Sequence, residues 1–92
     1  MSRIIRFHKF GAADVLRCEE RPEPTPARNE VQVRVQAIGI SWYDVLWRQN
    51  LAPTHARLPA GLGYEMAGVV TALASGVDDL SIGDRVASFP AA

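Results

Sequence analysis

The chain has 92 residues, enough for one small domain with a modest hydrophobic core. Its ten Lys and Arg residues balance its ten Asp and Glu residues, so no basic field is expected to attract nucleic acid or an anionic membrane. Hydrophobic residues make up 48% of the sequence, but no apolar run approaches the ~20 residues that span a bilayer. A single cysteine, Cys18, excludes an internal disulfide. Because the start also lacks the apolar core of a signal peptide, we expect a cytoplasmic protein that binds neither nucleic acid nor membrane.

The first half of the chain predicts strands separated by a proline-rich link. Residues 3–10 and 15–21 read as two strands that pair with each other. Prolines at 22, 24 and 26 exclude regular pairing and predict an extended link. Apolar and polar residues then alternate over residues 31–40, which predicts a half-buried strand.

A short helix is predicted over residues 41–48. Ser41 is a suitable N-cap, and Asp44 three residues later completes a capping box in which Asp replaces the preferred Glu or Gln. Asp44 and Arg48 stand one helical turn apart and can pair. Asn50 fits the C-terminal end of this helix.

The segment around residues 58–86 is the most distinctive part of the chain. Its apolar runs at residues 62–73 and 85–89 predict two strands joined by a compact loop. Mostly strands with one short helix predict a β-barrel-like domain with the helix packed beside it. Residues 61–63 are not a nucleotide-binding fingerprint, because Met66 occupies the third glycine position and no helix follows.

Glycines and one acidic residue interrupt the first of these apolar runs. Gly61, Gly63 and Gly68 lie in or beside the predicted strand, where glycine marks a bulge, a bend or close backbone approach. Glu65 stands inside the apolar segment, where an unpaired buried charge is costly. We therefore expect Glu65 to be a buried anchor whose basic partner lies outside this chain, with a structural rather than a catalytic role.

GLGYEMAGVV, followed by a spacer and GDRV, resembles the GxExxGxV…GDxV signature of the medium-chain dehydrogenase/reductase superfamily. The sequence is similar in particular to the zinc-independent quinone oxidoreductase branch, from about residue 31 to residue 89. This resemblance implies a mainly β fold, a GroES-like, partly open β-barrel with a short helix. Residues 1–92 would form the N-terminal, substrate-side catalytic domain of a two-domain α/β enzyme, without its nucleotide-binding Rossmann domain. The chain would then be a fragment of that enzyme or a natural short protein.

Two positions distinguish this chain from the zinc-dependent members of the superfamily. Those members carry a cysteine after a Gly-Ile pair and a histidine before the glutamate, where this chain has Ser41 and Tyr64. Neither residue type binds zinc well. His8 and His55 have no ligand-like spacing and are expected to be strand or surface histidines. The resemblance therefore implies a site without metal.

The quinone oxidoreductase branch also carries an Asn-x-x-Asp-x-x-x-Arg pattern after the central strand. Here Asp44 and Arg48 match it, and Ser41 replaces the asparagine with a shorter hydrogen-bonding group. The resemblance implies that Ser41 and Tyr64 are catalytic, because both can donate to a carbonyl oxygen as negative charge develops. It further implies that Ser41 and Leu62 contact the cofactor.

Aromatic residues interleave with this pattern and suit a flat aromatic substrate. The resemblance implies that Trp42, Tyr43 and Leu46 bind substrate, although the two rings could equally be core or domain interface. For Trp47, packing is favoured. The residues expected to be structural are Asp44, Arg48, Glu65, Gly63 and Gly68.

The implied activity is that of an NADPH-dependent quinone or enone oxidoreductase that transfers hydride without zinc. NADPH would be bound mainly by the missing domain, so the 92-residue chain alone is expected to be inactive, and the full-length protein is expected to be a homodimer. The alternative is a non-catalytic GroES-like binding or assembly module. Fold analogy does not choose between them, whereas a strand, a Gly-rich turn and a helix encoded downstream would favour the enzyme.

Overall fold

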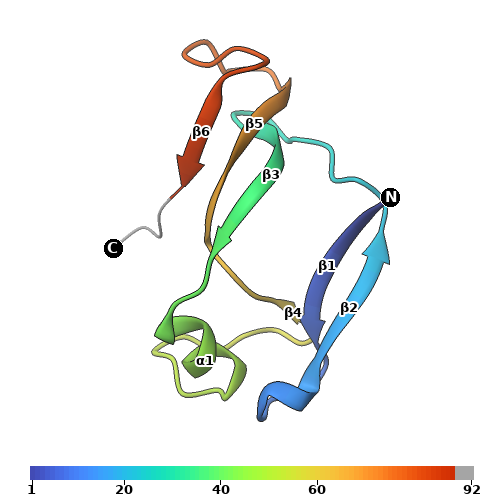
Figure 1. Cartoon of the computed structure of the whole chain (residues 1–92), viewed down its shortest axis with the longest axis vertical. Coiled ribbons are helices and arrows are strands. Elements are labelled where there is room, and N and C mark those ends of the chain that lie inside the picture. The colour runs from blue at the N-terminus through green and yellow to red at the C-terminus, as the bar shows by residue number, and fades with distance from the viewer. Residues whose placement is uncertain (89–92) are drawn as a thin grey trace. The chain divides into compact units, whose positions relative to one another are not determined.

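A computed structural model describes residues 1–88 of the chain, which form two compact units. Unit 1 comprises residues 1–23 and 40–63, and unit 2 comprises residues 24–39 and the chain from residue 64 onward. Each unit has its own three-stranded sheet (Figure 1). The predicted mainly β fold with one short α-helix is confirmed.

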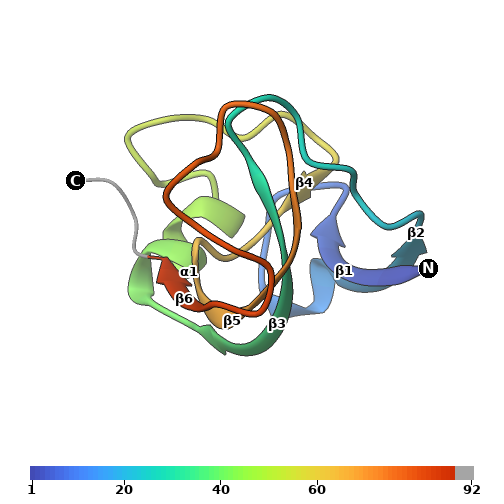
Figure 2. The same ribbon diagram turned by 90° about the horizontal axis from the view of Figure 1, so that it is seen from above.

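The sheet of unit 1 has the strand order β2-β1-β4 and is antiparallel throughout. Its elements are β1 (Ser2–Phe7), a 3-10 turn η1 (Ala13–Val15), β2 (Leu16–Arg21) and β4 (Ala60–Gly61). The predicted pairing of the first two strands is confirmed, and they lie side by side in Figure 2. The first strand ends at Phe7 rather than at residue 10, because the chain bends at residues 8 and 9. Beyond the bend, the Gly11 N–H donates to the carbonyl of Arg48 at 3.1 Å.

The core of unit 1 is small. Phe7, Val15 and Ala60 are its buried members. Five partly buried apolar residues pack against them: Phe10, Leu16, Trp47, Ala56 and Leu62. The packing role predicted for Trp47 is thus confirmed. Full burial of a side chain such as Phe7 contributes about 1.5–3 kcal/mol, so few residues carry most of the stability of this unit.

Helix α1 (Trp42–Arg48) has only seven residues. Ser41 is its N-cap and forms the predicted capping box with Asp44. Asn50 has a φ of 63°, in the left-handed region that often follows a helix. Since isolated helices of this length are marginal in water, α1 depends on its contacts with the rest of unit 1.

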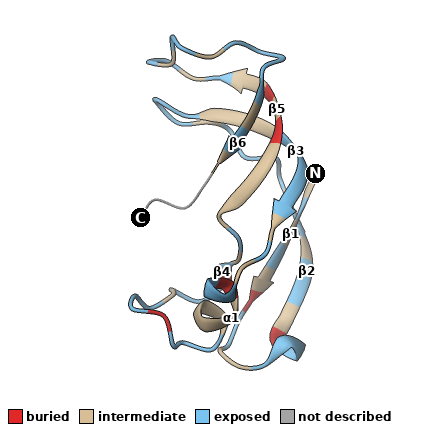
Figure 3. Ribbon diagram, turned by 60° about the vertical axis from the view of Figure 1, so that its left-hand side comes forward, coloured by how far each residue is buried: buried red, intermediate tan, exposed pale blue. Residues whose placement is uncertain are grey.

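The sheet of unit 2 has the order β3-β5-β6 and is also antiparallel. Its strands are β3 (Val31–Gly39), β5 (Glu65–Leu73) and β6 (Arg85–Ser88). The two strands predicted near the end of the chain are confirmed, although the first begins at Glu65 because Gly63 turns the chain with a φ of 86°. Phe89, the predicted last residue of the second strand, lies outside the described residues. Among the described part of unit 2, the buried positions are Gly68 and Val70, both on β5 (Figure 3).

The simple alternation predicted for residues 31–40 is wrong for the second half of the strand. Val35 is 47% exposed, and Ala37, on the same predicted face, is exposed as well. The register of β3 against β5 shifts between Gln32 and Val33 and again between Val35 and Ala37. Each irregularity interrupts the two-residue period that the prediction assumed, and the side chains beyond it no longer follow one face.

Close backbone approach, predicted at the glycines, is confirmed at Gly68. A Cβ atom built on Gly68 would overlap the carbonyl oxygen of Arg34 and would lie 2.7 Å from Cγ1 of Val33. Both neighbours belong to the irregular part of β3. The bulged pairing of β3 with β5 therefore requires a residue without a side chain at this position.

Glu19 on β2 joins two basic residues of the neighbouring segment. The Arg6 Nε–H donates to its Oε1 at 2.7 Å, and His8 Nε2 lies 3.1 Å from each carboxylate oxygen. The hydrogen bond from Arg6, and after it the one with His8, favours the ionised form, so the pKa of Glu19 lies below its ordinary value of 4.5. This group supports the pairing of β1 with β2.

We predict that Gly68→Val prevents proper folding of unit 2. The introduced side chain must displace the Arg34 backbone, and overpacking of this kind costs at least about 1–3 kcal/mol. Soluble yield and the thermal midpoint provide the measurement. Gly61→Ala is the matched control, because its Cβ would meet Ile4 Cδ1 at 3.7 Å and the Ile5 carbonyl oxygen at 4.0 Å, both ordinary contact distances. A soluble Gly68→Val protein with an unchanged melting curve would contradict the close approach.

A second prediction concerns the pH dependence of stability. Because the folded-state pKa of Glu19 is depressed, its contribution is present above pH 4.5 and is lost as the pH falls through the lower folded value. Glu19→Gln should therefore melt below wild type near neutral pH, and the difference should shrink in acid. Thermal midpoints between about pH 3 and about pH 7 test this. Glu20→Gln, on the opposite face of β2, controls for the lost charge, and an equal pH profile for both variants would refute the prediction.

Candidate functional site

The N-terminal turn of α1 carries the largest group of predicted site residues, and Ser41 opens it. Ser41 is half-buried and has extended backbone, with φ of −127° and ψ of 168°. Its N–H donates to Oδ2 of Asp44 at 3.0 Å, and the Asp44 N–H donates to the Ser41 carbonyl at 3.1 Å. These two hydrogen bonds fix the backbone of Ser41 at the start of the helix.

Asp44 is the buried charged residue of the described chain, with 8% exposure. Its Oδ2 serves the helix cap, and its Oδ1 accepts the N–H of Gly63 at 3.0 Å. The predicted pair with Arg48 is not formed: Arg48 Nε–H donates to the Gly11 carbonyl at 3.1 Å, and both ion pairs found within residues 1–88 involve Glu19. The side chain of Asp44 turns back toward the start of α1, away from Arg48 one turn later.

Aromatic rings line the exposed side of the same turn. Trp42 is 71% exposed and Tyr43 is 37% exposed, while Leu46 is half-buried. Tyr43 stacks on Trp47 with 6.4 Å between ring centroids and an interplanar angle of 22°. Its hydroxyl lies 3.5 Å from Thr54 Oγ1. The start of α1 therefore presents partly exposed ring surface beside a hydroxyl-bearing residue.

Residues 61–63 lie against α1 within unit 1. Leu62 is half-buried and packs on the core formed by Phe7 and its neighbours. The carbonyl of Gly61 accepts the Nε1–H of Trp47 at 3.1 Å. Sequence reasoning identified Gly61 and Gly63 individually but missed their hydrogen bonds to the helix, because the partners are 14 and 19 residues apart in the chain.

The remaining predicted site residues, Tyr64 and Glu65, belong to unit 2. Tyr64 is half-buried. Glu65 is the first residue of β5 and pairs with Gly39. A Cβ on Gly39 would lie 3.0 Å from Oε2 of Glu65, so the acidic side chain lies over the glycine. Glu65 is half-buried rather than buried, because it stands at the end of β5 and not within the strand.

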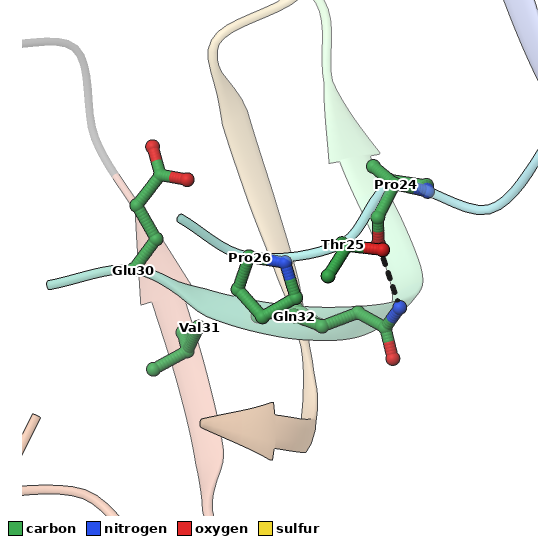
Figure 4. A pocket seen from close by; sticks show the side chains of 7 residues that line it. Pro24, Thr25, Pro26, Glu30, Val31 and Gln32 are labelled. Atoms are coloured by element: carbon green, nitrogen blue, oxygen red, sulfur yellow. Dashed lines mark hydrogen bonds between the residues drawn. The ribbon is translucent and has the colours of Figure 1, made fainter. Parts of the chain in front are cut away.

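Unit 2 also contains a groove that the sequence did not reveal. Its volume is about 390 Å³, and it lies where the proline-rich link runs beside the start of β3 (Figure 4). Gln32 Nε2–H donates to the Pro24 carbonyl at 2.8 Å and its Oε1 accepts the hydroxyl of Thr71 at 2.9 Å, which ties the link to the sheet. None of the predicted site residues lines this groove.

The histidines occupy ordinary surface positions. His8 contacts Glu19, and His55 Nδ1 lies 2.7 Å from Oδ1 of Asn50. Within residues 1–88, no three His, Cys, Asp or Glu side chains gather in a way that could hold a metal ion. In the same part of the chain, none of the helices is long and apolar enough to cross a membrane.

Comparison with known protein families gives one match that covers most of the chain. The alcohol dehydrogenase GroES-like domain family matches residues 27–91. Quinone oxidoreductase 1 of Escherichia coli is 45% identical over 86 residues, which cover 94% of this chain and 26% of that protein. The rat synaptic vesicle membrane protein VAT-1 homolog is 40% identical over 86 residues, which cover 91% of this chain and 21% of the relative.

Solved structures give the same result. The crystal structure of Escherichia coli quinone oxidoreductase complexed with NADPH superimposes with a TM-score of 0.89 and 44% identity, over 94% of this chain and 26% of the other. The resemblance to quinone oxidoreductases of the medium-chain dehydrogenase/reductase superfamily is thereby confirmed. The chain spans about a quarter of the length of the curated relatives that it matches.

Proposed function

The chain belongs to the family of alcohol dehydrogenase GroES-like domains, and from that premise we propose that it forms the N-terminal, substrate-side domain of an NADPH-dependent quinone or enone oxidoreductase that works without zinc. The observation that carries this proposal is the 45% identity with a protein named quinone oxidoreductase. The likeness to a quinone oxidoreductase complexed with NADPH supports the choice of cofactor.

Two residue types support the metal-free part of the proposal. Ser41 and Tyr64 occupy the positions at which zinc-dependent members of the superfamily carry a cysteine and a histidine. A neutral hydroxyl is a poor zinc ligand but a good hydrogen-bond donor. We assign each hydroxyl a donor role in the reaction, in which it would stabilise the negative charge that develops during reduction.

The exposed rings at the start of α1 support the choice of substrate. Trp42 and Tyr43 keep much of their surface uncovered in this chain, and with Leu46 they would form the apolar walls against which a planar quinone or enone lies. When bound, NADPH supplies the hydride, and the protein contributes orientation and exclusion of water. A dry, apolar slot serves both tasks.

The chain's own residues fit one end of NADPH better than the other. A pyrophosphate is commonly bound by the free N–H groups at a helix start. The N–H of Ser41, at the start of the one α-helix within residues 1–88, already donates to the carboxylate of Asp44, and a second anion there would meet like charge. We therefore assign Ser41 and Leu62 to the redox-active end of the cofactor. Its pyrophosphate we assign to a Rossmann domain of a longer, cytoplasmic, homodimeric protein.

We predict that the full-length protein oxidises NADPH with small quinones or simple enones in the absence of added metal. The 92-residue chain alone should neither bind nor oxidise NADPH, because within residues 1–88 the start of the one α-helix is already occupied by the Asp44 carboxylate. NADPH absorbance, followed against a quinone panel, an enone and a primary alcohol with NADP, makes the measurement. Zinc-dependent oxidation of the alcohol would overturn the proposal. No activity with any of the substrates, together with no NADPH binding, would favour a non-catalytic module.

The two hydroxyls give a sharper prediction. Ser41→Ala and Tyr64→Phe should each lower kcat/KM by roughly 5-fold to 150-fold, as loss of one donor worth about 1–3 kcal/mol in the transition state requires. Both variants should remain folded, although Ser41→Ala also removes the N-cap side chain of α1 and should lower the stability by about 0.5–2 kcal/mol. Ser81→Ala, in the exposed loop between β5 and β6, is the matched control. Unchanged kcat/KM in both variants would remove these residues from the catalytic site.

A further inference from the structure

Helix α1 holds the segment of residues 61–63 at two points. Asp44 Oδ1 accepts the N–H of Gly63 at 3.0 Å, and Trp47 Nε1–H donates to the carbonyl of Gly61 at 3.1 Å. The two helix residues stand three positions apart, so their side chains leave the same face of α1. The two bonds flank Leu62, and we call this arrangement the two-point clamp.

The direction of the bonds makes the clamp specific. The helix accepts a hydrogen bond on one side of Leu62 and donates one on the other, so a slip of the segment by one residue would bring mismatched groups together. Gly63 has a φ of 86°, a backbone conformation that residues other than glycine rarely adopt. The clamp therefore fixes both the place and the local backbone shape of residues 61–63.

One carboxylate links this segment to the start of the helix. Asp44 uses Oδ1 for Gly63 and Oδ2 for the N–H of Ser41, at 3.0 Å in each case. The side chain is buried, and hydrogen bonds to an ionised group out of water are stronger than those between neutral groups. Ser41 and the residue after Leu62 are thus held by the two oxygens of a single rigid group.

We propose that Asp44 and Trp47 are positioning residues that fix the distance between Ser41 and Leu62 and thereby shape the site for the redox-active end of NADPH. This inference rests on the proposed function, which assigns both positioned residues to the cofactor. Asp44 is not a catalytic acid or base here, because it is buried and both of its oxygens already accept backbone N–H groups. Its effect on hydride transfer would act through Ser41 and Leu62.

The same helix provides a matched control at its other end. Arg48 Nε–H donates to the carbonyl of Gly11, and the Gly11 N–H donates to the carbonyl of Arg48, each at 3.1 Å. This contact anchors α1 to a different loop and touches neither Ser41 nor residues 61–63. Arg48→Ala should therefore lower stability without changing the geometry of the proposed cofactor site.

The experiment uses the full-length protein with three variants. Asp44→Glu keeps the charge and supplies the residue preferred in a capping box, but its longer side chain cannot keep both bonds. Trp47→Phe keeps the ring and removes the N–H donor. For each protein we would measure the dissociation constant of NADPH by calorimetry, kcat/KM with a quinone, the primary deuterium isotope effect with deuterated NADPH, and the melting temperature.

We expect Asp44→Glu and Trp47→Phe to weaken NADPH binding, to lower kcat/KM by roughly 10-fold to 100-fold, and to raise the isotope effect, since small misplacements of reacting groups slow transfer by such factors. Arg48→Ala should change the melting temperature alone. If the two clamp variants behave like Arg48→Ala while the wild type is active, the clamp has no positioning role. A wild-type protein that neither binds nor oxidises NADPH would instead overturn the proposed function, and this inference with it.

Discussion

The arrangement of unit 1 depends on the two hydrogen bonds that the carboxylate of Asp44 accepts. Helix α1 has seven residues, too few to be stable by its own backbone hydrogen bonds. Asp44 caps the helix through Ser41 and at the same time ties it to Gly63, far away in the chain. A buried carboxylate without hydrogen-bond partners would cost several kcal/mol. Unit 1 is therefore stable only when the N–H groups of Ser41 and Gly63 both reach the Asp44 carboxylate.

Unit 2 is organised by a different constraint, the close approach of two strands. The bulged register of β3 brings the Arg34 backbone against Gly68 on β5, and no side chain fits between them. The same irregularity leaves Val35 and the residues after it exposed. The irregular register of β3 thus interrupts the alternation of buried and exposed side chains, as β-bulges commonly do.

The two constraints bear on the proposed chemistry in a simple way. If hydride transfer proceeds without a metal, no strong Lewis acid compensates for a poorly placed substrate, and rate depends on geometry and on a few hydrogen bonds. The groups proposed for that work in unit 1 are a hydroxyl at a capped helix start, exposed aromatic rings and a clamped loop. All of them depend on the placement of one short helix.

The sequence alone determined the features that depend on neighbours in the chain. It predicted the strands, the short helix and its capping box, because these follow from residue periodicity and from contacts three or four residues apart. The superfamily followed instead from the resemblance of the glycine-containing segment to a known signature. Only the tertiary structure decided which distant groups meet. Asp44 bonds Gly63 rather than Arg48, and Arg48 bonds Gly11, across 19 and 37 residues. The bulges of β3 likewise depend on its pairing with β5, since side-chain pattern specifies which residues prefer burial but not which backbone groups will satisfy each other.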